Sequence, residues 1–343
     1  MTQDLLQPQL SGWATCWMHV ATELDTAQFA SRRKPINKIQ AFEDVFGRLE
    51  SSSPSAQWAA LLHTATIDLA TARTIEPHLD ALTILSEVWS TAPEPDTYWG
   101  VYAAEVPDSG LVAERSQGQT FELTGEKRWC SLATELTHAI VTAEVDDNRQ
   151  AFAIHLQKPD VTHSEEVWNS EGLNEIPSGS IQCHNSPAKP VGEPGWYLER
   201  QGFWTGAIRV AACWLGGAIG MAQSAAEKHS GRPQPSPLGN LTLGRIDAEI
   251  YAGVSMLVHA ATIIEAADDL DINEHRKLAF RVRNGIYRIA QKIQQLSKEL
   301  AGPTTLTQDQ HFTKTDADLS VYLSQHHGVR DEAELGQLLG NKP

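Results

Sequence analysis

Trp129 and Ser131 place a large aromatic side chain and a hydroxyl group two positions apart. They follow an alternating run in which Phe121 and Leu123 occupy every second position, as they would in a β-strand. A tryptophan beside a sheet can pack on a flat aromatic cofactor, and a hydroxyl group can hydrogen-bond the edge of that cofactor. A tryptophan in a protein core is the alternative, and the residue pattern alone leaves both open.

The elements that position these two residues are predicted to form a β domain. Gly125, followed by charged residues, predicts a turn after the first strand, and residues 139–141 predict a second, buried strand. Short apolar runs separated by turn residues fill residues 96–195, which indicates an antiparallel β domain. The remaining runs are Tyr98–Ala104, Ala151–Leu156 and Ser180–Cys183.

Helical patterns flank this β domain on both sides. In an N-terminal helical domain, residues 1–95, apolar residues recur at helical spacing over residues 58–72, and Pro77 predicts the start of a further helix. Residues 196–343 are predicted to form a C-terminal helical bundle. Its expected helices are Phe203–His229, which is rich in small residues and therefore buried, Arg245–Asp268, Glu274–Leu300, and Asp316–His326.

Composition limits the class of protein. The 343 residues are 41% hydrophobic and 20% charged, which is ordinary for a globular chain of two or three domains. The 27 basic and 43 acidic residues give a formal net charge of −16, which argues against nucleic acid or an anionic membrane as partner. We expect neither a secretory signal nor an apolar run of the ~20 residues that span a bilayer.

The cysteines indicate a reducing compartment. Cys16, Cys130, Cys183 and Cys213 lie far apart, and none of them forms a CxxC pair. Neither a zinc site nor a disulfide framework is therefore expected. The last three lie in apolar surroundings and are predicted to be small core residues. A cytoplasmic location fits these features best.

The segment LTGEKRWCSLA, followed by AIVTA at residues 139–143, resembles the middle-domain signature of the acyl-CoA dehydrogenase family of flavoproteins. The order of helices, β domain and helical bundle is similar to the plan of that family, and the resemblance covers most of the chain. It implies an α+β, acyl-CoA dehydrogenase-like fold with an N-terminal helical part, a middle antiparallel β barrel and a C-terminal four-helix bundle. It also implies FAD as cofactor and a homodimer or homotetramer.

The resemblance implies a flavin site around the β domain. Trp129 and Ser131 fall on the family positions whose aromatic ring and hydroxyl group contact the flavin. The preceding strand is altered, because Ala104 replaces the flavin-contacting threonine and the Gly-Ser-Asp ending of the family motif is missing. Ala103 and Ala104 are therefore expected to contact the flavin through their backbone alone. Arg232 matches an arginine that reaches the flavin pyrophosphate of a neighbouring subunit, with an isolated exposed arginine as the alternative.

The resemblance also implies a substrate groove and a base. Arg209 matches a groove-lining arginine in a D-x-x-R pattern, although Gly206 replaces the aspartate, and an interdomain salt bridge is the alternative. The C-terminal glutamate that serves many family members as base is missing, and the matching region carries His326 and His327. Histidine is a base near neutral pH, so these two are the candidate catalytic residues. Capping of a terminal helix is the alternative role.

The implied function is a flavin-dependent oxidoreductase that acts on the CH–CH group of an acyl thioester. Two alternatives remain open, a flavin monooxygenase or oxidase on the same fold and a non-catalytic descendant kept for binding or assembly. The missing glutamate and the altered strand weaken the first function. Trp129 and Ser131 argue against a non-catalytic protein.

Overall fold

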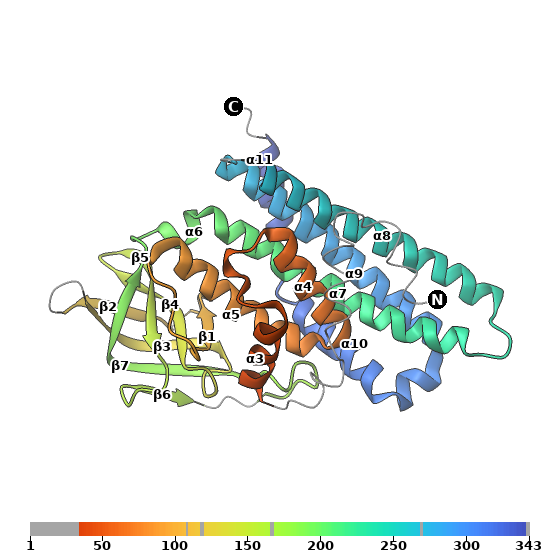
Figure 1. Ribbon diagram of the computed structural model, residues 1–343, viewed down its shortest axis with the longest axis horizontal. Coiled ribbons are helices and arrows are strands. Elements are labelled where there is room, and N and C mark those ends of the chain that lie inside the picture. The colour runs from red at the N-terminus through yellow and green to blue at the C-terminus, as the bar shows by residue number, and fades with distance from the viewer. Residues whose placement is uncertain (1–33, 108, 117–119, 165–167, 268–269, 341–343) are drawn as a thin grey trace.

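A β-barrel and a bundle of long helices lie side by side, with short N-terminal helices between them (Figure 1). The computed structural model describes residues 34–340, apart from 108, 117–119, 165–167 and 268–269. The fold class predicted from the sequence is confirmed, with helices, barrel and bundle in the expected order. Cys16 and the first part of the predicted helical domain lie outside the described residues.

The N-terminal helices are α3 (Pro35–Phe46), the short η1 (Leu49–Ser51), α4 (Pro54–Ile67) and α5 (Leu69–Val88). Ser53 caps α4 by accepting a hydrogen bond from the Ala56 N–H, as expected for a serine before a proline-started helix. The prediction that Pro77 begins a helix is wrong, because Pro77 lies inside α5. The break falls at Asp68, which has extended backbone and whose carboxylate binds Lys38 and the Thr71 hydroxyl.

The barrel closes through one strand that pairs with three others. Strand β4 pairs with β2 and with β5, and the ring is completed in the order β4, β2, β3, β7, β5. Strand β1 lies beside the first half of β4, parallel to it, so the barrel is largely but not wholly antiparallel. The strands are β1 (Trp99–Tyr102), β2 (Leu111–Arg115), β3 (Phe121–Ser131), β4 (His138–Val145), β5 (Asn148–His155), β6 (Val161–Ser164) and β7 (Ser178–Val191).

Strand β3 differs from the sequence prediction. The turn expected at Gly125 does not form, and the strand continues past it with a shift in its register against β7. Gly125 has φ +121, and a Cβ there would lie 2.3 Å from the Gly110 carbonyl oxygen, so only glycine fits. A second register shift lies between Lys127 and Cys130. Such bulges add a residue to one strand and redirect the side chains around it.

The C-terminal helices are α6 (Trp196–Glu199), α7 (Gln201–Ser230), α8 (Pro237–Ala266), α9 (Ile272–Gln308), α10 (Gln310–Leu323) and α11 (Val329–Gly340). Gly302, at φ 77, interrupts α9 where the sequence predicted its end. Helix α7 forms the centre, and its small residues touch α4. A Cβ on Gly216 would lie 2.3 Å from the Leu62 carbonyl oxygen, so the two backbones are in direct contact.

The apolar composition of α7 reflects its place in the core. By length and composition α7 could span a bilayer, which the sequence interpretation did not foresee, but 78% of its most apolar window is buried inside the fold. Cys130, Cys183 and Cys213 are free and buried, as predicted. The described residues contain no cluster of three metal-ligating side chains. The division into three domains stays a prediction.

Candidate active site

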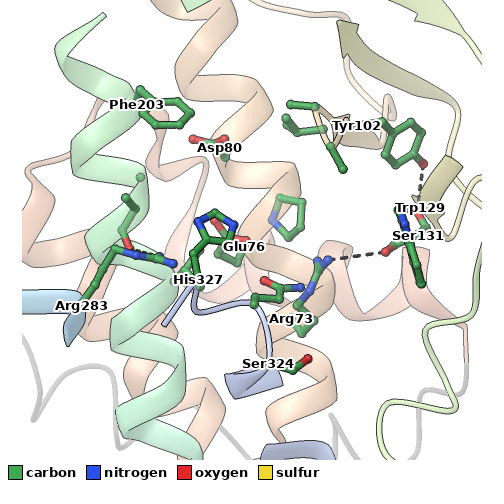
Figure 2. A pocket seen from close by; sticks show the side chains of 18 of the residues that line it. Arg73, Glu76, Asp80, Tyr102, Trp129, Ser131, Phe203, Arg283, Ser324 and His327 are labelled. Carbon is green, nitrogen blue, oxygen red and sulfur yellow. Dashed lines mark hydrogen bonds between the residues drawn. The ribbon is translucent and has the colours of Figure 1, made fainter. Parts of the chain in front are cut away.

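A cavity of about 740 Å³ lies where the barrel meets the helices (Figure 2). Its size falls within the roughly 300–1,000 Å³ of ordinary ligand sites. The barrel contributes the end of β1 and the end of β3, and the helices contribute α5, the first turns of α7, part of α9 and the segment that joins α10 to α11. The cavity is therefore assembled from parts of the chain that are far apart in sequence.

Trp129 presents its ring to this cavity. The side chain is 54% exposed, although Cys130, the next residue of the strand, is buried. Its backbone has φ +61, an uncommon conformation for a bulky residue, at the second bulge of β3. Such backbone strain costs about 1–3 kcal/mol and concentrates at functional sites. Leu173, which also lines the cavity, has φ +52.

Ser131 lies beside Trp129 with its hydroxyl group in the cavity. Its Oγ is 2.7 Å from the Ser178 Oγ. It is also 3.5 Å from an Arg73 guanidinium nitrogen (Figure 2). The Tyr102 hydroxyl donates to the Ser131 carbonyl oxygen at 2.9 Å and fixes the end of the strand. Ser131 therefore offers a hydroxyl group to a ligand next to a cation.

Ala103 and Ala104 line the same wall directly after the end of β1. Tyr98 faces β4, because its carbonyl oxygen accepts from the Thr137 and His138 N–H groups. Successive residues of a strand direct their polar groups to opposite edges, so Val101 of β1 faces away from β4 and toward the cavity that it lines. The Ala103 carbonyl oxygen already accepts from Arg149. The remaining backbone groups at this edge can bind a ring that offers hydrogen-bonding atoms.

The structure separates the two histidines predicted as catalytic. His327 lines the cavity, its side chain is 71% exposed, and its Nδ1 lies 3.3 Å from Asp331 Oδ1. His326 is buried behind the cavity and stacks on Tyr287 at 4.1 Å. Burial lowers the pKa of His326.

His326 is therefore a structural residue, which corrects its prediction as a catalytic base. Its Nδ1 accepts from the Gly328 N–H, so its Nε2 donates to Asn284 at 2.7 Å. Both ring nitrogens are engaged, and neither is left to take a proton from a substrate. The side chain fixes the tail that carries His327.

Arg209 does not belong to the residues that line the cavity in the described part of the chain. It is 1% exposed, and its guanidinium donates to Asp80 on α5 at 3.0 Å and to Gln57 on α4 at 2.7 Å. The prediction of a substrate-binding arginine is thus replaced by its alternative, an interdomain salt bridge. Gly206 leaves the space for this partner, since a Cβ there would lie 3.0 Å from the Asp80 carboxylate.

Arg232 lies far from the cavity, in the exposed turn between α7 and α8 at the end of the bundle away from the barrel (Figure 1). Its guanidinium is 3.4 Å from the Leu300 and Ala301 carbonyl oxygens. It cannot reach a flavin in its own cavity. A contact with the flavin of a neighbouring subunit stays a prediction.

Sequence reasoning missed Glu76, a buried carboxyl group on α5 that lines the cavity. The side chain is 7% exposed, and among the described residues no hydrogen-bond or ion-pair partner contacts it. Burial and the nearby Asp80 carboxylate raise the pKa of Glu76 to about 7, against the opposite effect of Arg209, Arg73 and Arg283. The signal in the sequence was Glu76 and Asp80, a pair of acidic residues four positions apart among the apolar residues of the helix.

This arrangement can hold a flat heteroaromatic ring and move a proton. Trp129 offers an aromatic face, and Ser131 and the β1 edge offer hydrogen bonds to the rim of a ring. Glu76 projects from α5 toward the cavity, which Arg283 borders on another side (Figure 2). A carboxyl group with a pKa near neutral pH can act as a general base or acid.

Solved structures show which proteins share this fold. No protein-family model and no curated protein matches the sequence. Dibenzothiophene monooxygenase TdsC from Paenibacillus sp. A11-2, with FMN and indole, superposes with a TM-score of 0.81, 14% identity, and coverage of 96% of each chain. KijD3 with FMN and a dTDP-linked amino sugar gives 0.74 and 17% identity over 100% of this chain and 94% of that chain.

A glutaryl-CoA dehydrogenase from Mycobacterium smegmatis with FADH2 gives a TM-score of 0.76 and 17% identity over 99% of this chain and 96% of that chain. At such low identities these likenesses show the fold alone. They establish that the chain has the acyl-CoA dehydrogenase fold over nearly its whole length. The neighbours named here include both a dehydrogenase and a monooxygenase, so the fold does not select one reaction.

Proposed function

We propose that this protein is a flavin-dependent oxidoreductase whose flavin ring occupies the cavity between the barrel and α5. The observation that carries the proposal is Trp129, which a strained bulge holds out over the cavity instead of in the core. A residue that only fills the core gains nothing from a positive φ at a bulge, so this strained conformation indicates a functional role for Trp129. The flavin-bound neighbours support the same assignment.

The residues present fit a flavin ring. Trp129 would pack on the ring, and Ser131 and the backbone of Ala103 and Ala104 would hydrogen-bond its edge. When bound, a flavin accepts or donates hydride and single electrons. FAD is the proposed cofactor, because Arg232 of a neighbouring subunit would bind its pyrophosphate. FMN is the alternative, and it is the flavin bound in the TdsC and KijD3 neighbours.

Oxidation of the CH–CH group of an acyl thioester is the first candidate reaction. It needs a base for the proton next to the carbonyl group, and Glu76 supplies a buried carboxyl group in the cavity. A glutaryl-CoA dehydrogenase in complex with FADH2 is among the neighbours that share this fold, which supports this candidate.

A flavin monooxygenase or oxidase is the second candidate, and the charge at the rim favours it. Glu334 on α11 lines the cavity with a side chain that is 51% exposed, whereas Asp331 is buried and pairs with His327. Coenzyme A carries several phosphate charges, which an exposed carboxylate at an entrance repels. His327 is exposed beside Asp331 and offers a second group for proton transfer at this rim.

One experiment separates the two reactions. The flavin-loaded protein is mixed without oxygen with a panel of acyl-CoA thioesters, and the visible flavin absorbance is followed. Bleaching by a thioester identifies the dehydrogenase. No bleaching, together with oxygen consumption above that of the same mixture without the protein when NADH and a flavin reductase supply reduced flavin, identifies the monooxygenase or oxidase. A protein that takes up no flavin contradicts both and leaves the binding or assembly role.

The remaining proposals concern partners and location. A homodimer or homotetramer is proposed, since the α8 surface exposes Leu238 and Leu241 at 75% and 51%. The substrate is a small molecule rather than a nucleic acid or a membrane, in line with the net charge of −16. A cytoplasmic location is proposed from the same composition.

A further inference from the structure

Glu76 differs from the other acidic residues of the cavity in having no partner. Asp80 pairs with Arg209 and Arg200, Asp331 pairs with His327, and Glu334 pairs with Arg276. Over the described residues, Glu76 alone of these four carboxyl groups lacks a hydrogen bond or an ion pair. A buried polar group normally has a partner, and the exceptions call for a functional explanation. The open side of Glu76 faces the cavity.

We infer that Glu76 is the proton acceptor of the reaction, and that it takes a proton from the substrate bound between α5 and the flavin. The inference rests on the proposed function. It names a catalytic residue on the N-terminal helical domain, whereas the sequence placed the candidate bases in the C-terminal tail.

The surroundings of Glu76 suit this role from every side. On α5 itself, Arg73 and Asp80 lie one helical turn before and after it and act in opposite directions. Arg209 from α7 and Arg283 from α9 favour the ionised carboxylate. Tyr197, Cys213 and Tyr322 also interact with it electrostatically, and burial raises the pKa of each, so all three stay neutral near pH 7. The carboxyl group therefore changes charge while its neighbours keep theirs.

The proton transfer balances in the thioester case. The C–H bond next to the thioester carbonyl breaks, and its proton goes to the Glu76 carboxylate. The electron pair of that bond forms the new carbon–carbon double bond, while hydride leaves the next carbon atom for the flavin, which is the oxidant. Glu76 then returns its proton to water. The same role for Glu76 applies to another substrate if its oxidation by the flavin also releases a proton to the Glu76 carboxylate.

The test uses the flavin-loaded protein and needs no known substrate. The midpoint potential of the bound flavin is measured between pH 5.5 and 8.5 for the wild type, for Glu76→Gln and Glu76→Asp, and for the control Glu334→Gln at the exposed rim. An ionised carboxylate disfavours electron transfer to the flavin. We expect Glu76→Gln to match the wild type at pH 5.5 and to have a higher potential at pH 8.5.

The control Glu334→Gln and Glu76→Asp should follow the wild type at both ends of the pH range. A potential difference that is absent, or is the same at both pH values, overturns the inference while the proposed function survives. A wild-type protein that holds no flavin is a different result, because it overturns the proposed function itself. Any substrate found to bleach the flavin should then react at least ~100-fold more slowly with Glu76→Gln, through kcat rather than KM.

Discussion

Trp129 is the residue on which the flavin assignment depends. Replacing it with alanine removes one face of the proposed ring site, and aromatic stacking contributes about 1 kcal/mol beyond buried area. We predict that Trp129→Ala weakens FAD retention by about tenfold, measured by fluorescence titration. Trp168→Ala is the matched control, since Trp168 lines the same cavity but donates its indole N–H to the Gly172 carbonyl oxygen at 3.1 Å. Equal losses in both variants would refute the assignment.

The protonation of Glu76 should also make the free energy of unfolding depend on pH. Its pKa is about 7 in the folded protein and about 4.3 when unfolded, so the folded state holds a proton that the unfolded chain releases between these values. Stability from this group is complete below about pH 4 and is lost as the pH rises to 7. The loss is on the order of 3 kcal/mol.

Glu76→Gln therefore should gain stability relative to the wild type as the pH rises from 5 to 8. Thermal unfolding curves at each pH measure this difference. Glu334→Gln, which changes an exposed carboxylate, should show no such trend. A difference in Tm that stays constant with pH would mean that Glu76 does not titrate in this range.

Single residues show where sequence reasoning reaches its limit. Trp129 and Ser131 were predicted because the segment around them resembles a family motif in which these two positions contact the flavin. Arg209 was misassigned because its partner, Asp80, lies 129 positions earlier on another helix. The importance of Glu76 depends on burial by several helices, and no local pattern reports that. Residue roles that depend on tertiary contacts are therefore the ones that could not be predicted from the sequence.

Packing of α7 against α4 is the interaction that joins the N-terminal helices to the bundle. A Cβ on Gly216 would meet the Leu62 backbone at 2.3 Å, so Gly216→Ala should destabilise the protein by about 2 kcal/mol, in the range of overpacked cores. Gly244 on α8 has no atom within 4 Å of an added Cβ. Gly244→Ala should therefore stabilise by about 0.5–1 kcal/mol.

Urea unfolding of the two glycine variants measures these opposite effects. Two variants of equal stability would show that α4 and α7 can separate at low cost. The small residues of α7 predicted this close contact correctly, because small side chains allow backbones to approach. The element boundaries were less predictable, since the bulge at Gly125 resembles a turn in sequence and Pro77 resembles a helix start.

At the scale of the whole molecule, we predict that the protein forms a homodimer or homotetramer. The chain has a mass of 37.6 kDa, and we expect analytical ultracentrifugation to give twice or four times that value. Leu241→Glu places a charge on the exposed apolar surface of α8 and should shift the protein toward the monomer. Val112→Glu, at an equally exposed position on β2, is the control and should leave the assembly unchanged. A wild-type monomer would also rule out a role for Arg232 at a neighbouring flavin.

The overall architecture was the part most accessible from sequence. Helical and strand periodicities alternate in long blocks, so the order of helical part, barrel and bundle follows from them, and the solved structures with this fold agree. The cavity between the blocks was not predictable in detail, because it forms only where β1, β3, α5 and α9 meet. The proposed reaction depends on the side chains that these four elements bring into the cavity.

The visible absorption spectrum of the purified protein after incubation with FAD, or in parallel with FMN, tests the central claim most directly. Unbound flavin is removed by gel filtration before the spectrum is recorded. We predict the bands of oxidised flavin at one equivalent per chain, and a clear loss of these bands for Trp129→Ala. A colourless, folded wild-type protein in both incubations would contradict the claim that this cavity is a flavin site.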